Sequence, residues 1–245
     1  MLLKVISESK AGLARKTNED SAYVRSLADG LLAIVCDGLG GNKAGDIASK
    51  IACDEIARFF VGDEVHRYPE RLVNALDYAH HHLMEKSFSH ENFSGMATTA
   101  VSLYISSDAA YWAHVGDSRL YFYFDGELHR LTKDHSLVQR LLDEGYISED
   151  VAAIHPQKNI ITRALGDKRQ DLKVDCASLV LDEDQPWKFM LCSDGVTNVV
   201  RDEELVSLLA NDDLDEIEEQ IVELIEKRGA PDNFTFIIIS NSMTG

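Results

Sequence analysis

Three apolar runs in this chain are bordered by aspartates, and no other feature limits its possible folds as much. The runs and their borders are Leu31–Cys36 before Asp37-Gly38, Phe189–Cys192 before Ser193-Asp194-Gly195, and Phe234–Ile239 after Asp232-Asn233. Their length and composition predict buried strands. One Asp-Gly pair is a common turn, but carboxylates fixed at three strand ends can converge on a metal with little ordering cost. Because oxygen ligands suit Mg or Mn, the pattern predicts a divalent-metal site.

The composition is that of one globular domain. The chain has 245 residues, of which 45% are hydrophobic, and its 4 prolines and 15 glycines form no linker-like stretch. We therefore expect a single domain over residues 1–245. The net charge of −18 leaves no basic stripe for a phosphate backbone, which argues against a nucleic-acid partner.

The cysteines and the N-terminus indicate the compartment. Cys36, Cys53, Cys176 and Cys192 are scattered without a C-x-x-C spacing, a usage that suits a reducing environment. Met1–Lys10 lacks a signal-peptide core, and no apolar run approaches the length of a membrane span. We expect a soluble cytoplasmic protein with no membrane partner.

The expected elements follow the order strands, two helices, many strands, two helices and a final strand. The expected strands are Leu2–Ser7, Ser21–Arg25, Leu31–Cys36, Ala97–Ile105, Ala110–Val115, Arg119–Phe124, Glu127–Leu131, Leu172–Leu181, Trp187–Cys192 and Phe234–Ile239. The expected helices are one along residues 47–56, one after Pro69, a short one at Leu137–Leu142, and two at Asp202–Ala210 and Leu214–Lys227.

This order predicts the fold class. Because helices and strands segregate along the chain, an α+β sandwich is favoured over a doubly wound parallel sheet. The simplest packing has two antiparallel sheets with a helix pair outside each. The polar segment of residues 135–160 interrupts the strands and could form a mobile cover over a site.

Two further segments carry groups suited to phosphate and metal chemistry. Arg15, Glu19 and Asp20 lie within six residues of one another. A guanidinium is the group for bidentate phosphate binding, although such a segment alone is also an ordinary polar loop. Asp117 lies between two expected strands, where a hairpin turn is the alternative interpretation.

The histidines give little support for other chemistry. His80, His81 and His82 lie on an expected helix, where neighbours point about 100° apart, so they cannot share one ion and are expected at the surface. His135 and His155 fall in the cover segment and could reach a site. The sequence shows no recognisable Ser-His-Asp or Cys-His arrangement, which weakens the case for catalysis by a nucleophilic side chain.

Taken together, the motifs resemble those of the bacterial type 2C (PPM) protein phosphatases, in order and over nearly the whole chain. The matching segments are Arg15…Asn18-Glu19-Asp20, Asp37-Gly38-Leu39-Gly40-Gly41, Met96-Ala97-Thr98-Thr99-Ala100, Val115-Gly116-Asp117-Ser118-Arg119, Leu131-Thr132-Lys133-Asp134-His135-Ser136, His155-Pro156, Asn159–Gly166, Cys192-Ser193-Asp194-Gly195 and Pro231-Asp232-Asn233-Phe234-Thr235.

The resemblance implies an αββα sandwich that holds two Mn or Mg ions, which bind and activate a bridging water. It implies that Asp37 bridges both ions and that the Gly38 carbonyl binds one of them. Asp194 and Asp232 are implied to hold the other ion.

The same resemblance implies supporting roles elsewhere. Glu19 and Asp20 would assist directly or through water, and Asp117, together with Asp194, would help to hold a third, weaker ion. Arg15 would grip the phosphoryl oxygens of phosphoserine or phosphothreonine. Residues 135–160 would be the flap of the family.

Three positions depart from the family pattern. Asn42 stands where many bacterial members have His, and Ala97 replaces the usual Gly before Thr98-Thr99. Leu39 occupies the place of a His proposed as general acid in eukaryotic members. None of these changes removes an implied ligand, but the donor of the leaving-group proton stays open, and a metal-bound water is one candidate.

The implied function is metal-dependent hydrolysis of phosphoserine and phosphothreonine in proteins, by a monomer that opposes a bacterial Ser/Thr kinase. Two alternatives stay open: a pseudophosphatase scaffold that binds phosphoproteins, and a phosphatase of small metabolites. The retained Asp37, Asp194, Asp232 and Arg15 argue against the scaffold, because a binding module has no need of the full set.

Overall fold

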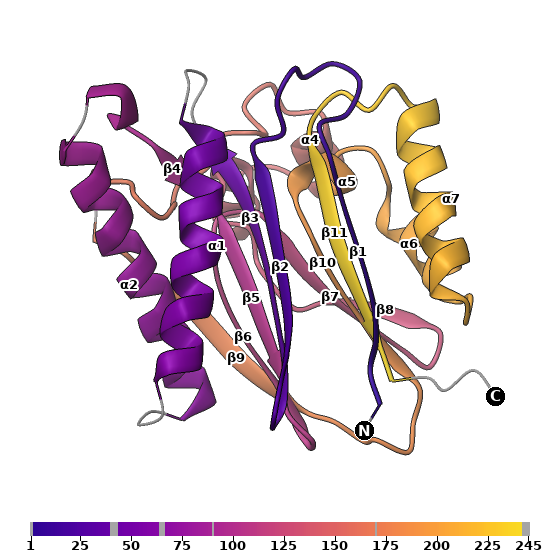
Figure 1. Cartoon of the computed structure of the whole chain (residues 1–245). Coiled ribbons are helices and arrows are strands. Elements are labelled where there is room, and N and C mark those ends of the chain that lie inside the picture. The colour runs from indigo at the N-terminus through magenta and orange to yellow at the C-terminus, as the bar shows by residue number, and fades with distance from the viewer. Residues whose placement is uncertain (1, 40–43, 64–66, 90, 170, 242–245) are drawn as a thin grey trace.

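Two antiparallel sheets packed face to face form the centre of the molecule in this computed structural model, which describes residues 2–39, 44–63, 67–89, 91–169 and 171–241 (Figure 1). One sheet has the order β1 (Lys4–Lys10), β11 (Phe234–Ser240), β10 (Trp187–Cys192), β7 (Arg119–Phe124) and β8 (Glu127–Arg130). The other has the order β2 (Asp20–Leu27), β3 (Gly30–Leu39), β5 (Ala100–Ile105), β6 (Ala109–Val115) and β9 (Asp175–Val180), with β4 (Ala97–Thr98) paired to the end of β3.

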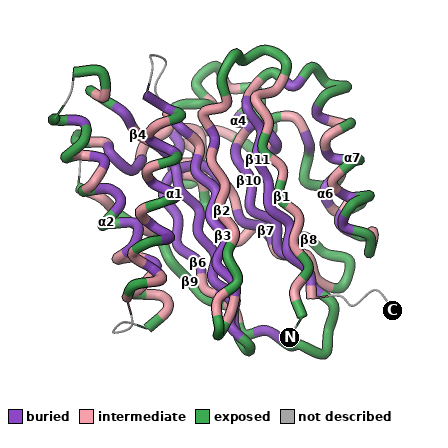
Figure 2. Tube along the Cα trace, in the orientation of Figure 1, coloured by how far each residue is buried: buried purple, intermediate pink, exposed green. Residues whose placement is uncertain are grey.

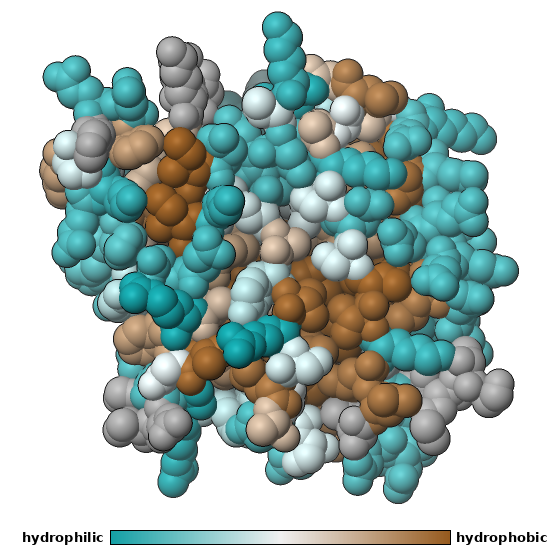
Figure 3. Space-filling model, viewed as in Figure 1, coloured by the Kyte–Doolittle hydropathy of each residue, from teal (hydrophilic) through white to brown (hydrophobic). Residues whose placement is uncertain are grey.

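A pair of helices covers the outer face of each sheet. Helices α1 (Gly45–Gly62) and α2 (Tyr68–Ser89) lie on the β2–β9 sheet, and α6 (Asp202–Leu209) and α7 (Leu214–Lys227) lie on the β1–β8 sheet (Figure 1). On α7 the buried residues Leu214, Ile217, Ile221 and Ile225 recur at helical spacing, and its outer surface is hydrophilic (Figure 3). The predicted α+β sandwich with an αββα layer order is confirmed.

Alternation along the strands produces three apolar layers. On β3, Leu32, Ile34 and Cys36 face α1 and α2, whereas Leu31 and Val35 face the other sheet. The inner strands are accordingly buried along their length, and exposure concentrates on loops and outer helix faces (Figure 2). Because both faces of the central strands are packed, the strand ends are held firmly at the rim of the sandwich.

The structure departs from the expected elements at several places. The expected strand 97–105 is broken at Thr99, whose backbone N–H donates to the Asp37 carbonyl (2.8 Å), and β9 begins three residues later than expected. Three short elements were not expected: η1 (Glu91–Phe93), α4 (Glu149–Ala153) and α5 (Asp194–Thr197). Helix α5 shows that Asp194-Gly195 opens a helical turn rather than a simple loop.

Residues 135–160 form a segment with little buried surface, built from α3 (Leu137–Asp143) and α4. Its two ends are tied together, since the Leu137 N–H donates to the Ile160 carbonyl at 2.8 Å. Within the two helices only Ala152 is buried. In the described part of the chain, no helix combines the length and the apolar character needed to cross a bilayer.

The expectation that all three α2 histidines lie at the surface was wrong for His80. This side chain is buried, and its Nδ1 accepts a hydrogen bond from the Gly166 N–H at 3.1 Å. Burial also lowers the pKa of its imidazole. His81 is exposed and His82 is half-buried. The three side chains do point in different directions, as expected, but the buried face of α2 is wide enough to include His80.

Candidate metal centre

The predicted aspartates come together at one end of the sandwich. Asp20 opens β2 directly opposite Asp37 near the end of β3. In the other sheet, the end of β10 lies beside the start of β11, which brings Asp194 close to Asp232. A hydrogen bond from Ser193 Oγ to Asp20 Oδ2 (2.7 Å) joins the two pairs across the sheets.

Asn233 holds the loop of Arg15 and Glu19 against this end of the sandwich. Its Oδ1 accepts the Glu19 N–H at 2.9 Å, and its Nδ2 donates to the carbonyls of Ala11 and Thr17, both at 2.9 Å. All hydrogen-bonding groups of this amide are therefore used to fix backbone. The sequence motif contains Asn233, but this clamping role could not be predicted from it.

Two glycines permit the close approach of the strand ends. A Cβ at Gly38 would lie 2.2 Å from the Gly45 carbonyl oxygen at the start of α1, and a Cβ at Gly195 would lie 1.8 Å from the Asn233 carbonyl oxygen. Neither distance is tolerable, so both positions require glycine. The Asp-Gly pattern thus reflects backbone packing around the cluster as well as a turn preference.

The carboxylates of the cluster raise one another's pKa values. Loss of hydration and the charges of Asp20, Asp194, Asp117 and Asp232 raise the pKa of Asp37 well above its usual range. Burial, opposed by a hydrogen bond from Ser193, raises the pKa of Asp20 to about 7. Loss of hydration and the charge of Asp232 likewise raise the pKa of Asp194. These shifts mean that the ionised cluster repels itself and favours a cation.

Asp117 provides the test of whether these residues fit a metal. The side chain is buried, and its Oδ1 has no hydrogen-bond partner among the described residues. Burial, with the charges of Asp194 and Asp134, raises the pKa of Asp117 to about 8. A buried polar atom without a partner is rare in native proteins, and a hard divalent ion accepts oxygen ligands of this kind. The donor set therefore fits Mg or Mn.

Arg15 and Glu19 lie at the rim of the cluster. The Arg15 guanidinium, 54% exposed, donates to Asp232 Oδ2 at 2.8 Å, so here its partner is a carboxylate of the cluster. The carboxyl of Glu19 packs over Gly45 at the N-terminus of α1, and burial raises its pKa. The helix N-terminus is a favourable place for this negative charge.

An ion-pair network that was not predicted lies beside the cluster. Asp134 accepts hydrogen bonds from Arg119 Nε (3.1 Å) and Nη2 (2.8 Å) and also pairs with Arg130. With Asp117 and Asp194, these three residues line a cavity of about 430 Å³ beneath the segment of residues 135–160. The pairing could not be predicted because Asp134 and Arg119 lie on different elements.

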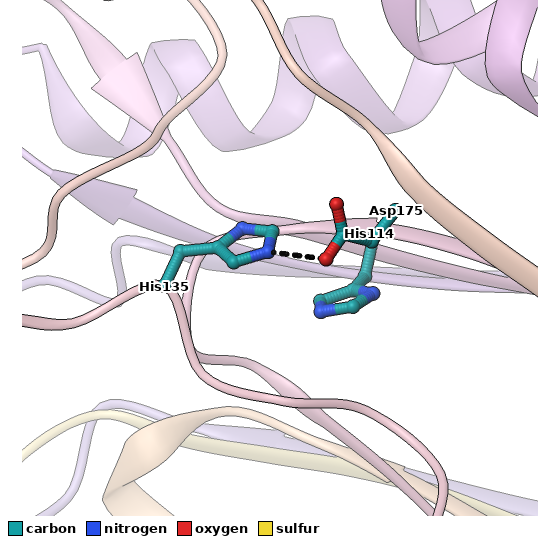
Figure 4. A group of neighbouring side chains, drawn as sticks. All are labelled: His114, His135 and Asp175. Carbon is teal, nitrogen blue, oxygen red and sulfur yellow. Dashed lines mark hydrogen bonds and ion pairs between the residues drawn. The ribbon is translucent and has the colours of Figure 1, made fainter. Parts of the chain in front are cut away.

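A compact trio of metal-type ligands lies near Asp117, formed by His114, His135 and Asp175 (Figure 4). Their ligand atoms lie within 4.8 Å of one another, and the two imidazole rings stack with centroids 4.7 Å apart. His135 Nδ1 accepts the Gly116 N–H at 3.1 Å, which assigns the ring proton to Nε2. This nitrogen lies 3.2 Å from Asp175 Oδ2, to which it donates, and 3.1 Å from the Arg163 guanidinium, which also pairs with Asp175.

This hydrogen bonding argues that His135 supports the fold rather than binding an ion. His114 donates through Nε2 to the Lys133 carbonyl at 3.0 Å and leaves its buried Nδ1 without a partner among the described residues. A metal at His135 Nε2 would have to displace the proton that the Gly116 contact assigns to that nitrogen. Burial and the neighbouring His114 lower the pKa of His135 to about 4, which keeps the ring neutral. His135 thereby holds the turn that carries Asp117. His155, the other histidine of the segment, accepts the Gln157 N–H.

The departures at Asn42, Ala97 and Leu39 are only partly visible. Asn42 and the Gly40-Gly41 pair lie outside the described residues. Ala97 pairs with Leu39 between β4 and β3, and both side chains are partly exposed. The carboxylate positions predicted from the sequence are all described.

Comparison with known proteins identifies the family. The family model described as protein phosphatase 2C matches residues 14–233. Protein phosphatase PhpP of Streptococcus pneumoniae is 34% identical over 239 residues, covering 94% of each protein. The crystal structure of the Mycobacterium tuberculosis serine/threonine phosphatase PstP/Ppp superposes with a TM-score of 0.88, at 31% identity and 98% coverage of both chains.

A further similar structure contains metal. The catalytic domain of the serine/threonine protein phosphatase PstP, in complex with 2 manganese ions, superposes with a TM-score of 0.85, at 29% identity and 97% coverage of both chains. This chain therefore belongs to the protein phosphatase 2C family. It is a serine/threonine protein phosphatase, a hydrolase of phosphoric monoesters, and phosphatases of this family use manganese or magnesium.

Proposed function

We propose that this chain removes phosphate from phosphoserine and phosphothreonine in proteins at a binuclear Mn or Mg centre. In this proposal Asp37 would be a ligand common to both ions, the Gly38 carbonyl would help to hold one, and Asp194 and Asp232 would help to hold the other. The proposal further assigns support of the centre to Glu19 and Asp20, directly or through water. Asp117, with Asp194, is proposed to hold a third, weaker ion.

The observation that carries the proposal is the convergence of Asp20, Asp37, Asp117 and Asp194 without enough protein cations to balance them. Asp20 and Asp117 are buried, and the Oδ1 atom of Asp117 has no partner among the described residues. Such a cluster is reasonable only if cations join it, because like charges at this spacing disfavour ionisation. The chemistry that two such ions supply when bound is a hydroxide nucleophile near neutral pH and neutralisation of phosphoryl charge.

The remaining work falls to side chains of the chain itself. Asn233 fixes the backbone at Ala11 and Thr17, on both sides of Arg15, which orients the loop that carries this side chain. Arg15 lies at the exposed rim and can exchange its carboxylate partner Asp232 for the phosphoryl oxygens of a substrate. The strand ends keep the carboxylates in place before substrate arrives, so little reorganisation accompanies the reaction.

We also propose how the chain works as a whole. It acts as a single domain and a monomer, with residues 135–160 as a flap beside the cavity. Its partners are phosphorylated proteins and, by analogy with the family, a Ser/Thr kinase that it opposes.

The test is hydrolysis of p-nitrophenyl phosphate and of phosphopeptides with Mn, with Mg and with chelator. We expect activity with either ion and none with chelator, because the ligands are all oxygens. Phosphoserine peptides should be cleaved in preference to a panel of sugar and nucleotide phosphates. Full activity of metal-free protein would disprove the mechanism, and binding of phosphopeptides without turnover in Mn would identify a scaffold.

A further inference from the structure

A flap lysine reaches a candidate metal ligand through a single asparagine. Lys158 Nζ donates to Asn198 Oδ1 at 3.1 Å, and Asn198 Nδ2 donates to Asp194 Oδ2 at 3.0 Å. Asn198 is also fixed by its backbone, whose N–H donates to the Asp194 carbonyl at 2.7 Å. Neither Lys158 nor Asn198 has a role in the function proposed above.

The chemistry of the two contacts explains why the intermediate is an amide. An amide offers an acceptor oxygen and donor hydrogens, so Asn198 presents its oxygen to the ammonium and its hydrogens to the carboxylate. Rotating the amide by 180° would place its N–H groups against the ammonium and its oxygen against the carboxylate. The positions of the amide oxygen and nitrogen are therefore determined by these two contacts. A lysine placed directly on Asp194 would compete with a metal ion for the same oxygen, whereas the amide transmits the contact without bringing a positive charge to it.

The flap has few other polar attachments. The first residues of the flap are anchored by His135, which contacts Gly116, Asp175 and Arg163, and by Ser136, whose Oγ accepts the Gln139 N–H. Beyond these contacts, in the part of the chain that the structure describes, side-chain hydrogen bonds and ion pairs join residues 137–160 to the body of the protein at two places. One is Lys158 with Asn198, and the other is Asp143 with Lys133, whose Nζ lies 2.7 Å from Asp143 Oδ1. Four large apolar side chains of the flap, Tyr146, Val151, Ile154 and Ile160, are exposed, Ile154 at 83%. The position of residues 137–160 therefore depends on few side-chain contacts.

The cavity beneath the flap connects this contact to the site. Lys158 and Asn198 line the same 430 Å³ space as Asp117 and Asp194. Movement of the flap away from the body would withdraw Lys158 from Asn198 and would release one of the two contacts that orient the amide. Conversely, an ion that fixes Asp194 would fix Asn198 and favour the docked flap.

We propose that Asn198 is a positioning residue that couples docking of the flap, through Lys158, to the orientation of Asp194 and thus to metal affinity. The inference rests on the proposed role of Asp194 as a ligand. It adds a consequence: metal binding and flap docking strengthen each other by the same factor, because coupling between two binding equilibria is reciprocal.

The test measures Mn²⁺ affinity by calorimetry and hydrogen exchange of residues 146–160, both without substrate. In the wild-type chain, Mn²⁺ should slow exchange in this segment. Lys158→Met, which keeps the side-chain stem, should abolish that slowing and weaken Mn²⁺ binding by about fivefold. Lys133→Met is the matched control, because it removes the other flap contact without touching Asn198. It should speed exchange but leave Mn²⁺ affinity within about twofold.

Asn198→Ala completes the cycle. It should weaken Mn²⁺ binding by about tenfold, the effect expected for a residue that orients a ligand, and adding Lys158→Met should then weaken it no further. Wild-type Mn²⁺ affinity in Lys158→Met would overturn the coupling, and so would full additivity in the double variant. Failure of the wild-type chain to bind Mn²⁺ at all would instead overturn the proposed function together with this inference.

Discussion

Two acidic regions border the same cavity, and they are balanced in opposite ways. Asp134 is surrounded by the guanidinium groups of Arg119 and Arg130. The cluster of Asp20, Asp37, Asp117 and Asp194 has hydroxyl, amide and backbone partners, and its members repel one another. The charge of Asp134 is balanced by protein cations once the chain has folded. The aspartate cluster is formed by folding but is electrostatically complete only with added cations.

The largest expected effect is on turnover in the aspartate cluster. Asp37→Asn and Asp194→Asn should each lower kcat at least about 100-fold, because an amide removes the charge that holds an ion worth several kcal/mol of catalysis. Steady-state assays in saturating Mn should be compared with Asp54→Asn, an exposed aspartate on α1. Both variants retaining more than about a tenth of wild-type kcat would contradict their assignment as ligands.

Removing the charge of Asp134 should lower the stability of the fold. Asp134→Asn leaves Arg119 and Arg130 without their carboxylate in a largely buried setting. We expect the free energy of unfolding to fall by about 3 kcal/mol, the cost of removing one partner of a buried pair. Urea unfolding in chelator measures this directly, and a loss below about 1 kcal/mol would show that water already balances the network.

Arg15 lies between the two cases, since it pairs with Asp232, a carboxylate at the rim of the cluster. Arg15→Ala should weaken binding of substrate and inorganic phosphate by about 1.5–3 kcal/mol, while metal affinity changes little. Arg15→Lys should recover only part of this, because an ammonium lacks the planar donor pair. Unchanged KM and kcat at full metal occupancy would show that another group binds the phosphate.

The pH dependence of the stability of the metal-free protein should report on the aspartate cluster. Asp20 and Asp117 have pKa values raised to about 7 and about 8, so between the unfolded value near 4 and these values the folded state binds more protons. Stability is therefore lost as pH rises through this window. His135, whose pKa is lowered to about 4, contributes the opposite slope up to its unfolded pKa near 6.5.

The carboxyls therefore act without an opposing contribution from His135 between about pH 6.5 and 8. Thermal unfolding in chelator should show stability falling across it, by at most about 1.4 kcal/mol per pH unit for each carboxyl. Asp117→Asn should reduce the slope, and saturating Mn should remove it. Stability that rises with pH in this interval would show that these carboxyls are ionised without metal.

The smallest effect concerns repulsion alone. In chelator, Asp37→Asn should be more stable than the wild-type chain by about 1 kcal/mol, because it relieves like-charge repulsion without changing side-chain volume. The same substitution should abolish stabilisation by Mn. A metal-free variant less stable than wild type would indicate that hydrogen bonds to Asp37 outweigh the repulsion.

The sequence predicted the layers well because strand and helix periodicity are local properties. Leu31–Cys36 and Phe234–Ile239 are apolar enough to require burial on two faces, and both are central strands. The family motifs predicted which aspartates would converge. Local pattern could not predict that His80 is buried by the Gly166 turn, since that contact joins positions far apart in the chain.

The same limit applies to residues around the site. Asn198 lies four residues after Asp194, a spacing that would have suggested contact if α5 had been expected. Asp194-Gly195 instead resembles a turn, because glycine there serves the approach of the Asn233 backbone. Asp134 stands in a recognised motif, but its arginine partners are determined by the pairing of β7 with β8.

The candidate ligands are divided between the two sheets, with Asp20 and Asp37 on one and Asp194 and Asp232 on the other. The thickness of the apolar layer between the sheets therefore determines how far apart the two halves of the candidate ligand set lie. Side chains such as Val35 and Leu191, which belong to this apolar layer, help to define that thickness. If the ions bind as proposed, the distance between their sites would in this sense be a mechanical property of the whole sandwich.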